Sequence, residues 1–180
     1  MPISESLTFP GFEELIYVWD SSSLINMKIS GNLRELREFA EHHNGRIRIP
    51  IPIGKEIGKR DDDLRAWWLR NQALLGTKFY SGREHKLHQE ITVKYAKEPF
   101  RKEGKTHTSL SDADTYAVVV AIARHWTLVT DENAMQAICR QNDYDANYMS
   151  STQFRKVIGG GVESFRGGAY EGGLGGKINN

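Results

Sequence analysis

The stretch from Ile16 to Ile25 constrains the fold of this chain more than any other part of the sequence. Four apolar, β-prone residues run into Asp20, three serines follow, and an apolar helical pattern then begins. An apolar run bounded in this way is typical of a buried strand, and serine side chains accept hydrogen bonds from the unpaired amides of a helix's first turn. An acid at the carboxyl end of such a strand lies where open α/β sheets place their ligands. Asp20 therefore either caps the turn or contributes to a binding site.

The rest of the hydrophobic pattern alternates between strands and helices. We expect strands at 15–19, 46–53 and 126–130, a short strand near Tyr148, and helices at 21–28, 33–43, 62–75, 83–97, 112–124, 133–140 and from Thr152 onwards. Pro50 and Pro52 confine the second strand to a sheet edge or end it early. Residues 101–109 are expected to form a basic loop, and Asp131 or Asn133 to cap the helix at 133–140. This order of elements predicts an α/β domain with a short parallel sheet.

Length and charge limit the organisation of the chain and its partners. The chain of 180 residues has the size of about one domain, and its formal net charge is +1, so nucleic-acid binding requires a local basic patch. We expect an N-terminal arm at 1–14, a folded domain at 15–158 and a flexible tail at 159–180, where glycine is too dense for ordering to be favourable.

Cysteine content and hydropathy indicate the cellular setting. Cys139 is the one cysteine in the sequence, which excludes an intramolecular disulfide and fits a reducing compartment. No apolar run approaches about 18 residues, and the N-terminus lacks the basic and apolar regions of a secretory signal. We therefore expect no membrane contact and a cytoplasmic location.

Acidic residues follow or begin the elements that meet at one edge of such a sheet. These acids are Asp20, Glu56, Asp112, Asp114, Asp131 and Glu132. In a parallel sheet, strand C-termini and helix N-termini gather at the same edge, so we expect these carboxylates to converge. Converging carboxylates stay ionised only when cations balance them, and oxygen ligands suit Mg²⁺ or Mn²⁺. Such ions position a phosphodiester and generate hydroxide from water, so the pattern indicates metal-dependent phosphodiester hydrolysis.

Four segments, taken together and in order, resemble the PIN domain family. The first segment corresponds to the family's opening strand with its Asp and Ser/Thr, and the second to the second acid of a subfamily of uncharacterised PIN-like toxins. The third corresponds to the helix with the third acid, and the fourth to the last strand with the fourth acid. The segments are Val18–Ile25, Lys55–Ile57 followed by Asp63, Leu64 and Trp67, Leu110–Ala121, and Thr127–Glu132. The resemblance spans residues 15 to 158.

The resemblance implies a three-layer α/β/α fold and cleavage of RNA with Mg²⁺ or Mn²⁺. Many prokaryotic members are toxins of VapC type that a co-encoded antitoxin neutralises, so it also implies an antitoxin partner and a homodimer. The matching catalytic acids are Asp20, Glu56, Asp114 and Asp131, and the matching metal ligands are Asp20, Asp114, Asp131 and Glu132. The identity of the fourth acid stays open. Thr130-Asp131 is the simpler match, whereas family members often have Thr-x-acid, which selects Glu132.

The first motif departs from the commonest family form, which has Thr or Ser-Asn after the first Asp. Ser21-Ser22 stands there instead, and Ser22 is a weaker candidate because its hydroxyl can still orient the carboxylate. Asp112 is also a weaker candidate, since an acid at that position is the more natural helix cap. The basic segment Arg101–Lys105 is a candidate for phosphate contacts, together with Lys55, Lys59 and Arg60.

Each assignment has a structural alternative. Glu56 also fits a solvated helix residue, and Trp67 and Trp68 either stack on bases or pack in the core. His85 and His88 have a spacing that allows metal binding, although no third ligand is evident. At the level of function, the alternatives are a non-catalytic PIN-like module that binds RNA or protein, and a structure-specific DNA nuclease.

Overall fold

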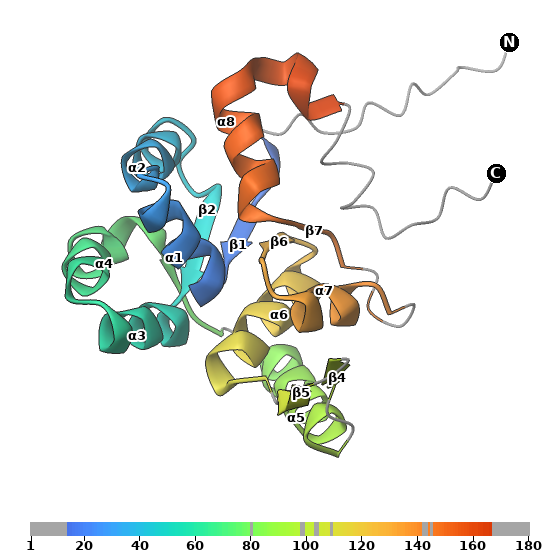
Figure 1. Cartoon of the computed structure of the whole chain (residues 1–180). Helices are drawn as coiled ribbons and strands as arrows, with labels where there is room; N and C mark the ends of the chain where they lie inside the picture. The colour runs from blue at the N-terminus through green and yellow to red at the C-terminus, as the bar shows by residue number, and fades with distance from the viewer. Residues whose placement is uncertain are drawn as a thin grey trace, which may run out of the picture.

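A five-stranded, all-parallel sheet forms the centre of the computed structural model (Figure 1). The structure describes residues 14–166 except 80, 98–99, 103–104, 109, 142–143 and 145. The sheet has the strand order β3-β2-β1-β6-β7 and is flanked by helices. Its strands are β1 (Tyr17–Trp19), β2 (Ile47–Pro50), β3 (Gly76–Thr77), β6 (Thr127–Val129) and β7 (Tyr148–Met149). The predicted α/β class and short parallel sheet are confirmed.

Helices connect successive strands, as parallel pairing requires. They are α1 (Ser21–Ile29), α2 (Leu33–His42), α3 (Ile51–Arg60), α4 (Asp62–Leu75), α5 (Gly82–Lys97), α6 (Asp112–Arg124), α7 (Asn133–Cys139) and α8 (Ser151–Arg166). The sequence predicted most of these within a few residues, because their apolar residues recur at helical spacing and their ends carry Ser, Asp, Asn or Gly.

The strand order reverses direction between β1 and β6. The chain moves outward from β1 to β2 and β3, and then returns so that β6 lies on the other side of β1. Trp19 at the end of β1 is opposite Val129 at the end of β6. Such a switch point leaves a crevice at the carboxyl ends of the strands, which is where open α/β sheets bind ligands.

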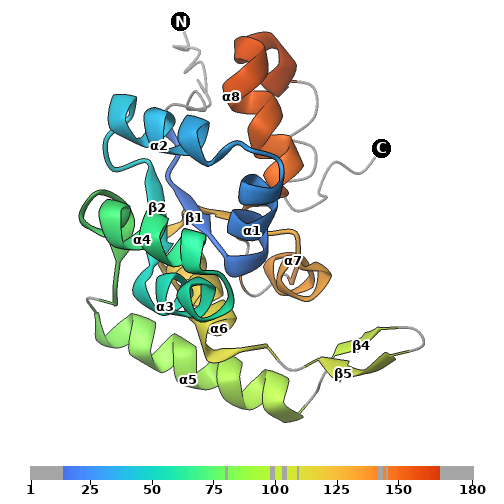
Figure 2. The same cartoon turned by 60° about the vertical axis from the view of Figure 1, so that its left-hand side comes forward.

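The core joins the sheet to helices from distant parts of the sequence. Phe154 of α8 packs edge-to-face against Tyr17 and Trp19, with ring centroids 5.0 and 4.9 Å apart. Helix α6 is buried on most sides because it contacts β1, β2 and β6 and also packs against α5 (Figure 2). This explains its continuous apolar run from Val118 to Ile122, since a helix without a solvent face shows no amphipathic pattern.

Three local expectations are wrong. The second strand ends at Pro50 rather than 53, and Ile51 begins α3 directly, because Pro52 in the first helical turn has no N–H to lose and a helical φ. The short β3 strand is missing from the prediction. The described residues of the predicted loop lie in two antiparallel strands, which form a hairpin of β4 (Phe100–Lys102) with β5 (Lys105–Thr108). In Figure 2 this hairpin stands apart from the sheet and its helices.

The chain ends lie largely outside the described residues. Residues 1–13 of the predicted arm and 167–180 of the predicted tail belong there. Helix α8 continues to Arg166, past the expected end of the domain at 158. Among the helices that the structure describes, none combines the length and apolar character needed to cross a membrane.

Candidate active site

Asp20 lies at the switch point, one residue past the end of β1. Its backbone N–H still donates to Val129 of β6 (3.2 Å), while its side chain caps α1 by accepting from the Ser23 N–H (2.8 Å). The capping interpretation is therefore correct as far as it goes. The side chain is nevertheless fully buried, which a simple surface cap does not require.

Two hydroxyl groups satisfy the second oxygen of Asp20. Thr130 Oγ1 donates to Oδ2 at 2.5 Å and Ser22 Oγ donates to the same atom at 2.9 Å. Burial raises the pKa of Asp20 from 3.8 to about 6, because desolvation penalises the charged form more than these hydrogen bonds favour it. Asp20 is thus a carboxylate held in one orientation at a marked electrostatic cost.

Glu56 faces the same edge from α3, the helix that follows β2. Its Oε2 accepts from Ser21 Oγ (3.1 Å) and, at the limit of hydrogen bonding, from Ser111 Oγ (3.5 Å). Its Oε1 is paired with the guanidinium of Arg60, one turn further along α3 (2.5 Å). Glu56 therefore bridges the starts of α1 and α6 and is not a solvated surface residue.

Asp114, in the first turn of α6, belongs with Asp20, Glu56 and Glu132 to a group of acids called here the acid cluster. It forms a capping box with Ser111, whose N–H donates to Asp114 Oδ2 (3.3 Å) and whose Oγ accepts from the Asp114 N–H (3.1 Å). Burial is the largest cause of a raised pKa of Asp114, and the negative charges of Glu56 and Glu132 raise it further. Acids from α3, α6 and the β6–α7 connection therefore act on one another electrostatically.

Asp131 and Glu132 differ sharply in their surroundings. Asp131 Oδ1 accepts from the Ser151 N–H (2.9 Å), and its Oδ2 accepts from Ser151 Oγ (2.6 Å) and Asn26 Nδ2 (2.7 Å). It therefore ties β6 to the start of α8 and to α1. Glu132 is exposed, is the N-cap residue of α7 without a side-chain capping bond, and its charge reaches Asp114. Neither Asp131 nor Asn133, the two expected caps, caps α7.

Other candidates lie away from this cluster. The exposed Asp112 carboxylate is 3.1 Å from His88 Nε2 of α5 rather than beside Asp20. Trp67 and Trp68 are both buried, so the core interpretation holds for both. Burial raises the pKa of the Cys139 thiol to about 12, as expected for an inert core residue.

Sequence reasoning did not predict that four residues hold the acids in place, and it assigned one of them, Arg60, to phosphate contacts instead. Thr130 and Ser21 donate to Asp20 and Glu56, respectively, Ser111 links Glu56 to Asp114, and Arg60 pairs with Glu56. The spacing Ser111-x-x-Asp114 is a readable capping-box signal, and Glu56 with Arg60 is an i,i+4 pair. No local spacing marks the contact of Thr130, because its partner Asp20 follows the neighbouring strand β1 and is distant in sequence.

The donor set has the chemistry of a site for a hard divalent cation. It offers carboxylate oxygens with neither thiolate nor imidazole among them, which is the preference of Mg²⁺ and Mn²⁺. The raised pKa values of Asp20 and Asp114 mean that a nearby positive charge would stabilise their ionised forms. Within the part of the chain that the structure describes, no three Asp, Glu, His or Cys side chains already stand close enough to hold a metal ion.

Comparisons with known proteins agree with this architecture. A chain of the 2.2 Å resolution structure of VapBC-1 from nontypeable Haemophilus influenzae superposes with a TM-score of 0.52 and 15% sequence identity, covering 77% of this chain and 99% of that one. At this identity the likeness establishes the fold, and the expected PIN-like fold is confirmed. No curated protein matches the sequence significantly. A family model matches residues 17–144, and the chain belongs to that family, which is described as Domain of unknown function (DUF4411).

Proposed function

We propose that the chain is a Mg²⁺- or Mn²⁺-dependent endoribonuclease. The observation that carries the proposal is the group of acids at the switch point, where Asp20 is buried at an electrostatic cost and Glu56 and Glu132 raise the pKa of Asp114. Carboxylates with raised pKa values are common at functional sites. Asp20 and Glu132 follow the carboxyl ends of β1 and β6, which form the binding edge of an open α/β sheet.

In this proposal Asp20, Asp114 and Glu132 hold the metal ion, and Asp131 keeps a structural role. When bound, the ion supplies Lewis-acid activation of the phosphodiester and a water of lowered pKa. Thr130 and Ser22 fix the orientation of Asp20. Glu56 completes the metal's ligand set or positions the attacking water, and Arg60 holds one of its oxygens.

We further propose that the chain is the toxin of a type II toxin–antitoxin pair that acts in the cytoplasm, with homodimer formation. The similar solved chain comes from a VapBC-1 structure, and the PIN family resemblance includes VapC-type toxins. A neighbouring open reading frame for a small DNA-binding protein would support this part of the proposal. Co-purification of the two gene products would test it.

A second candidate is a non-catalytic PIN-like module that binds RNA or protein. The observation that favours it is the absence of a preformed group of three metal-binding side chains among the described residues. The ion pair between Glu56 and Arg60, which occupies one carboxylate oxygen, points the same way. This candidate predicts RNA binding without cleavage in any divalent metal.

The test is hydrolysis of a mixed RNA pool in Mn²⁺, with single-stranded DNA in a parallel reaction. Asp20→Asn and Asp114→Asn should each lower the rate by about 100-fold or more, as expected when transition-state charge loses its stabilisation. Asp112→Asn is the matched control, because Asp112 is on the same helix but lies against His88, and it should retain nearly full activity. Metal-independent cleavage that is equal in all variants would refute the proposal, and cleavage of DNA alone would favour the DNA-nuclease alternative.

A further inference from the structure

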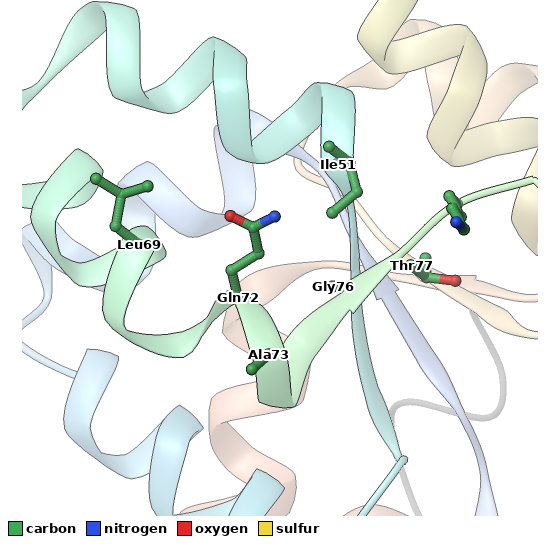
Figure 3. Close-up of a pocket in the computed structure, with 7 residues that line it drawn as sticks. Ile51, Leu69, Gln72, Ala73, Gly76 and Thr77 are labelled. Atoms are coloured by element: carbon green, nitrogen blue, oxygen red, sulfur yellow. The ribbon is translucent and has the colours of Figure 1, made fainter.

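A groove with two connected lobes runs between α3 and α4, beside the acid cluster. One lobe, of about 600 Å³, is lined by residues of both helices, including Lys55, Lys59 and Arg65. The other, of about 470 Å³, lies over the β3 edge of the sheet and reaches Lys78. Ile51, Leu69 and Gln72 line both lobes, so the two are continuous. Figure 3 shows Gln72 lying between Leu69 and Ile51 in the second lobe. Each lobe has the size of a small-ligand pocket, roughly 300–1,000 Å³.

Two glycines of α3 shape the floor of this groove. A Cβ at Gly54 would overlap the indole ring of Trp68, and one at Gly58 would lie 3.2 Å from Arg65 Cγ. Because these two positions carry no side chain, α4 approaches α3 closely, and Trp68 and Arg65 of α4 pack against the glycines of α3. The larger lobe is therefore formed by the two helices alone, without a loop.

The rim of the groove is basic and its floor is apolar. Lys55, Lys59 and Arg65 line the larger lobe with one acid, Asp62. None of the three cations forms an ion pair with another residue that the structure describes. Leu69 is 63% exposed where the lobes meet. Cations without an ion-pair partner can bind phosphates, and the apolar surface beside them can contact bases, so the groove is complementary to single-stranded nucleic acid.

The groove lies next to Glu56 by helix geometry. Glu56 faces the acid cluster from α3, and successive residues of an α-helix are about 100° apart around the axis. Lys55 and Lys59 therefore project on the neighbouring face of the same helix, within one turn of Glu56. A polynucleotide that passes over the acids needs only to cross α3 to enter the groove.

We propose that the α3–α4 groove binds the backbone of single-stranded RNA on one side of the cleavage point. This inference rests on the proposed nuclease function and names where its substrate extends. Lys55, Lys59 and Arg65 contact successive phosphates, and Ile51 and Leu69 contact base or ribose faces. A strand held in this way is presented to the acids in one direction.

The test measures binding separately from cleavage, with a labelled oligouridylate and the full-length Asp20→Asn chain. Adding Lys55→Ala, Lys59→Ala and Arg65→Ala should weaken binding by roughly 10- to 100-fold. The plot of log affinity against log salt should also become less steep, by about 2 in the magnitude of its negative slope, because each phosphate contact with a single strand contributes about 0.7. The matched control replaces three basic residues of α2 and α5, Arg34, Arg83 and Lys86, by Ala. It should change the affinity by less than about 2-fold, because it removes the same charge without removing a contact to RNA.

Several outcomes would overturn the inference. An unchanged affinity and slope in the groove variant would do so, as would an equal loss in the control, which would reflect net charge alone. Capture of a polyglutamate peptide by the groove without oligouridylate binding would assign the groove to an acidic protein partner. Lys59→Glu alone, at an exposed position, repeats the test if the triple variant unfolds. Groove-dependent RNA binding by a chain whose wild type cleaves nothing would refute the nuclease proposal and leave the groove assignment standing.

Discussion

Two buried carboxylates of this protein, Glu84 and Asp20, are stabilised in different ways. Glu84, on α5, accepts from the guanidinium of Arg124 through Oε1 (2.5 Å) and from Ser81 through Oε2. Asp20, at the end of β1, accepts from two hydroxyls and one amide. No cationic side chain pairs with Asp20 among the residues that the structure describes.

We interpret the difference as that between a structural acid, Glu84, and the metal ligand that we propose Asp20 to be. A buried charge is normally paired, because isolated burial is costly, and Glu84 follows that rule by joining α5 to α6. Asp20 does not, and burial raises its pKa to about 6. Residues that cost stability in this way are typical of functional sites, where stability is given up for activity.

Removing the charge should have opposite effects on stability at the two positions. Glu84→Gln removes the negative charge that the Arg124 guanidinium faces and should lower the free energy of unfolding by about 3–5 kcal/mol. Asp20→Asn removes a desolvated charge and should raise it by about 1–3 kcal/mol at pH 7.5. Urea denaturation of the three proteins in metal-free buffer measures both changes.

The Thr130 hydroxyl, a hydrogen-bond partner of Asp20, can adapt to the amide of Asp20→Asn. The Thr130 hydroxyl lies 3.5 Å from Met135 Sδ, so it can rotate its proton there and accept from the new amide. If Asp20→Asn destabilised the protein as much as Glu84→Gln, Asp20 would be an ordinary structural carboxylate, and the contrast between the two sites would be lost.

The burial of an unpaired carboxyl at Asp20 also predicts that the free energy of unfolding depends on pH. The folded-state pKa of Asp20 is raised above its unfolded value, so the folded protein binds more protons between about pH 4 and 6. The contribution of Asp20 to stability is therefore present at low pH and is lost as the pH rises through this window, by about 3 kcal/mol at 1.36 kcal/mol per unit. Urea midpoints at several pH values, in EDTA, should fall more steeply for the wild type than for Asp20→Asn. Parallel curves would contradict the assignment.

A smaller effect separates the two acids after β6. Asp131→Ala removes the hydrogen bonds to Ser151 at the start of α8 and should cost about 1 kcal/mol, as for other lost helix caps. Glu132→Gln touches no such bond and should leave stability nearly unchanged while lowering RNA cleavage. Thermal melts and cleavage rates of both variants compare the two roles. Full activity in Glu132→Gln with lost activity in a folded Asp131→Ala would reverse the assignment of the fourth acid.

Much of the fold was predictable because its signals are local. The strand–Asp–serine pattern around Asp20 and the aspartate-rich start of α4 each depend on neighbours within one or two turns. The strand expected through Ile53 failed because alternating isoleucines imitate a strand, whereas Pro52 fits a first helical turn equally well.

The placement of the acids at one edge of the sheet was predictable, but the contacts of each acid were not. The four acids were readable from strand ends and helix starts. What distinguishes Asp131 from Glu132 is Ser151, which lies 20 residues further along the chain. The orientation of Asp20 likewise depends on Thr130, 110 residues away. Contacts of this range leave no periodic trace in the sequence.

The most direct test of the acid cluster as a cation site is calorimetric titration of Mn²⁺ into the wild type and Asp20→Asn at pH 7.5. We predict a saturable heat in the wild type that disappears in Asp20→Asn, because the amide replaces a carboxylate ligand of the ion. Glu84→Gln, if folded, should retain the wild-type heat. Identical titrations of wild type and Asp20→Asn would contradict the central claim that the buried acid at the end of β1 is kept to bind a metal ion.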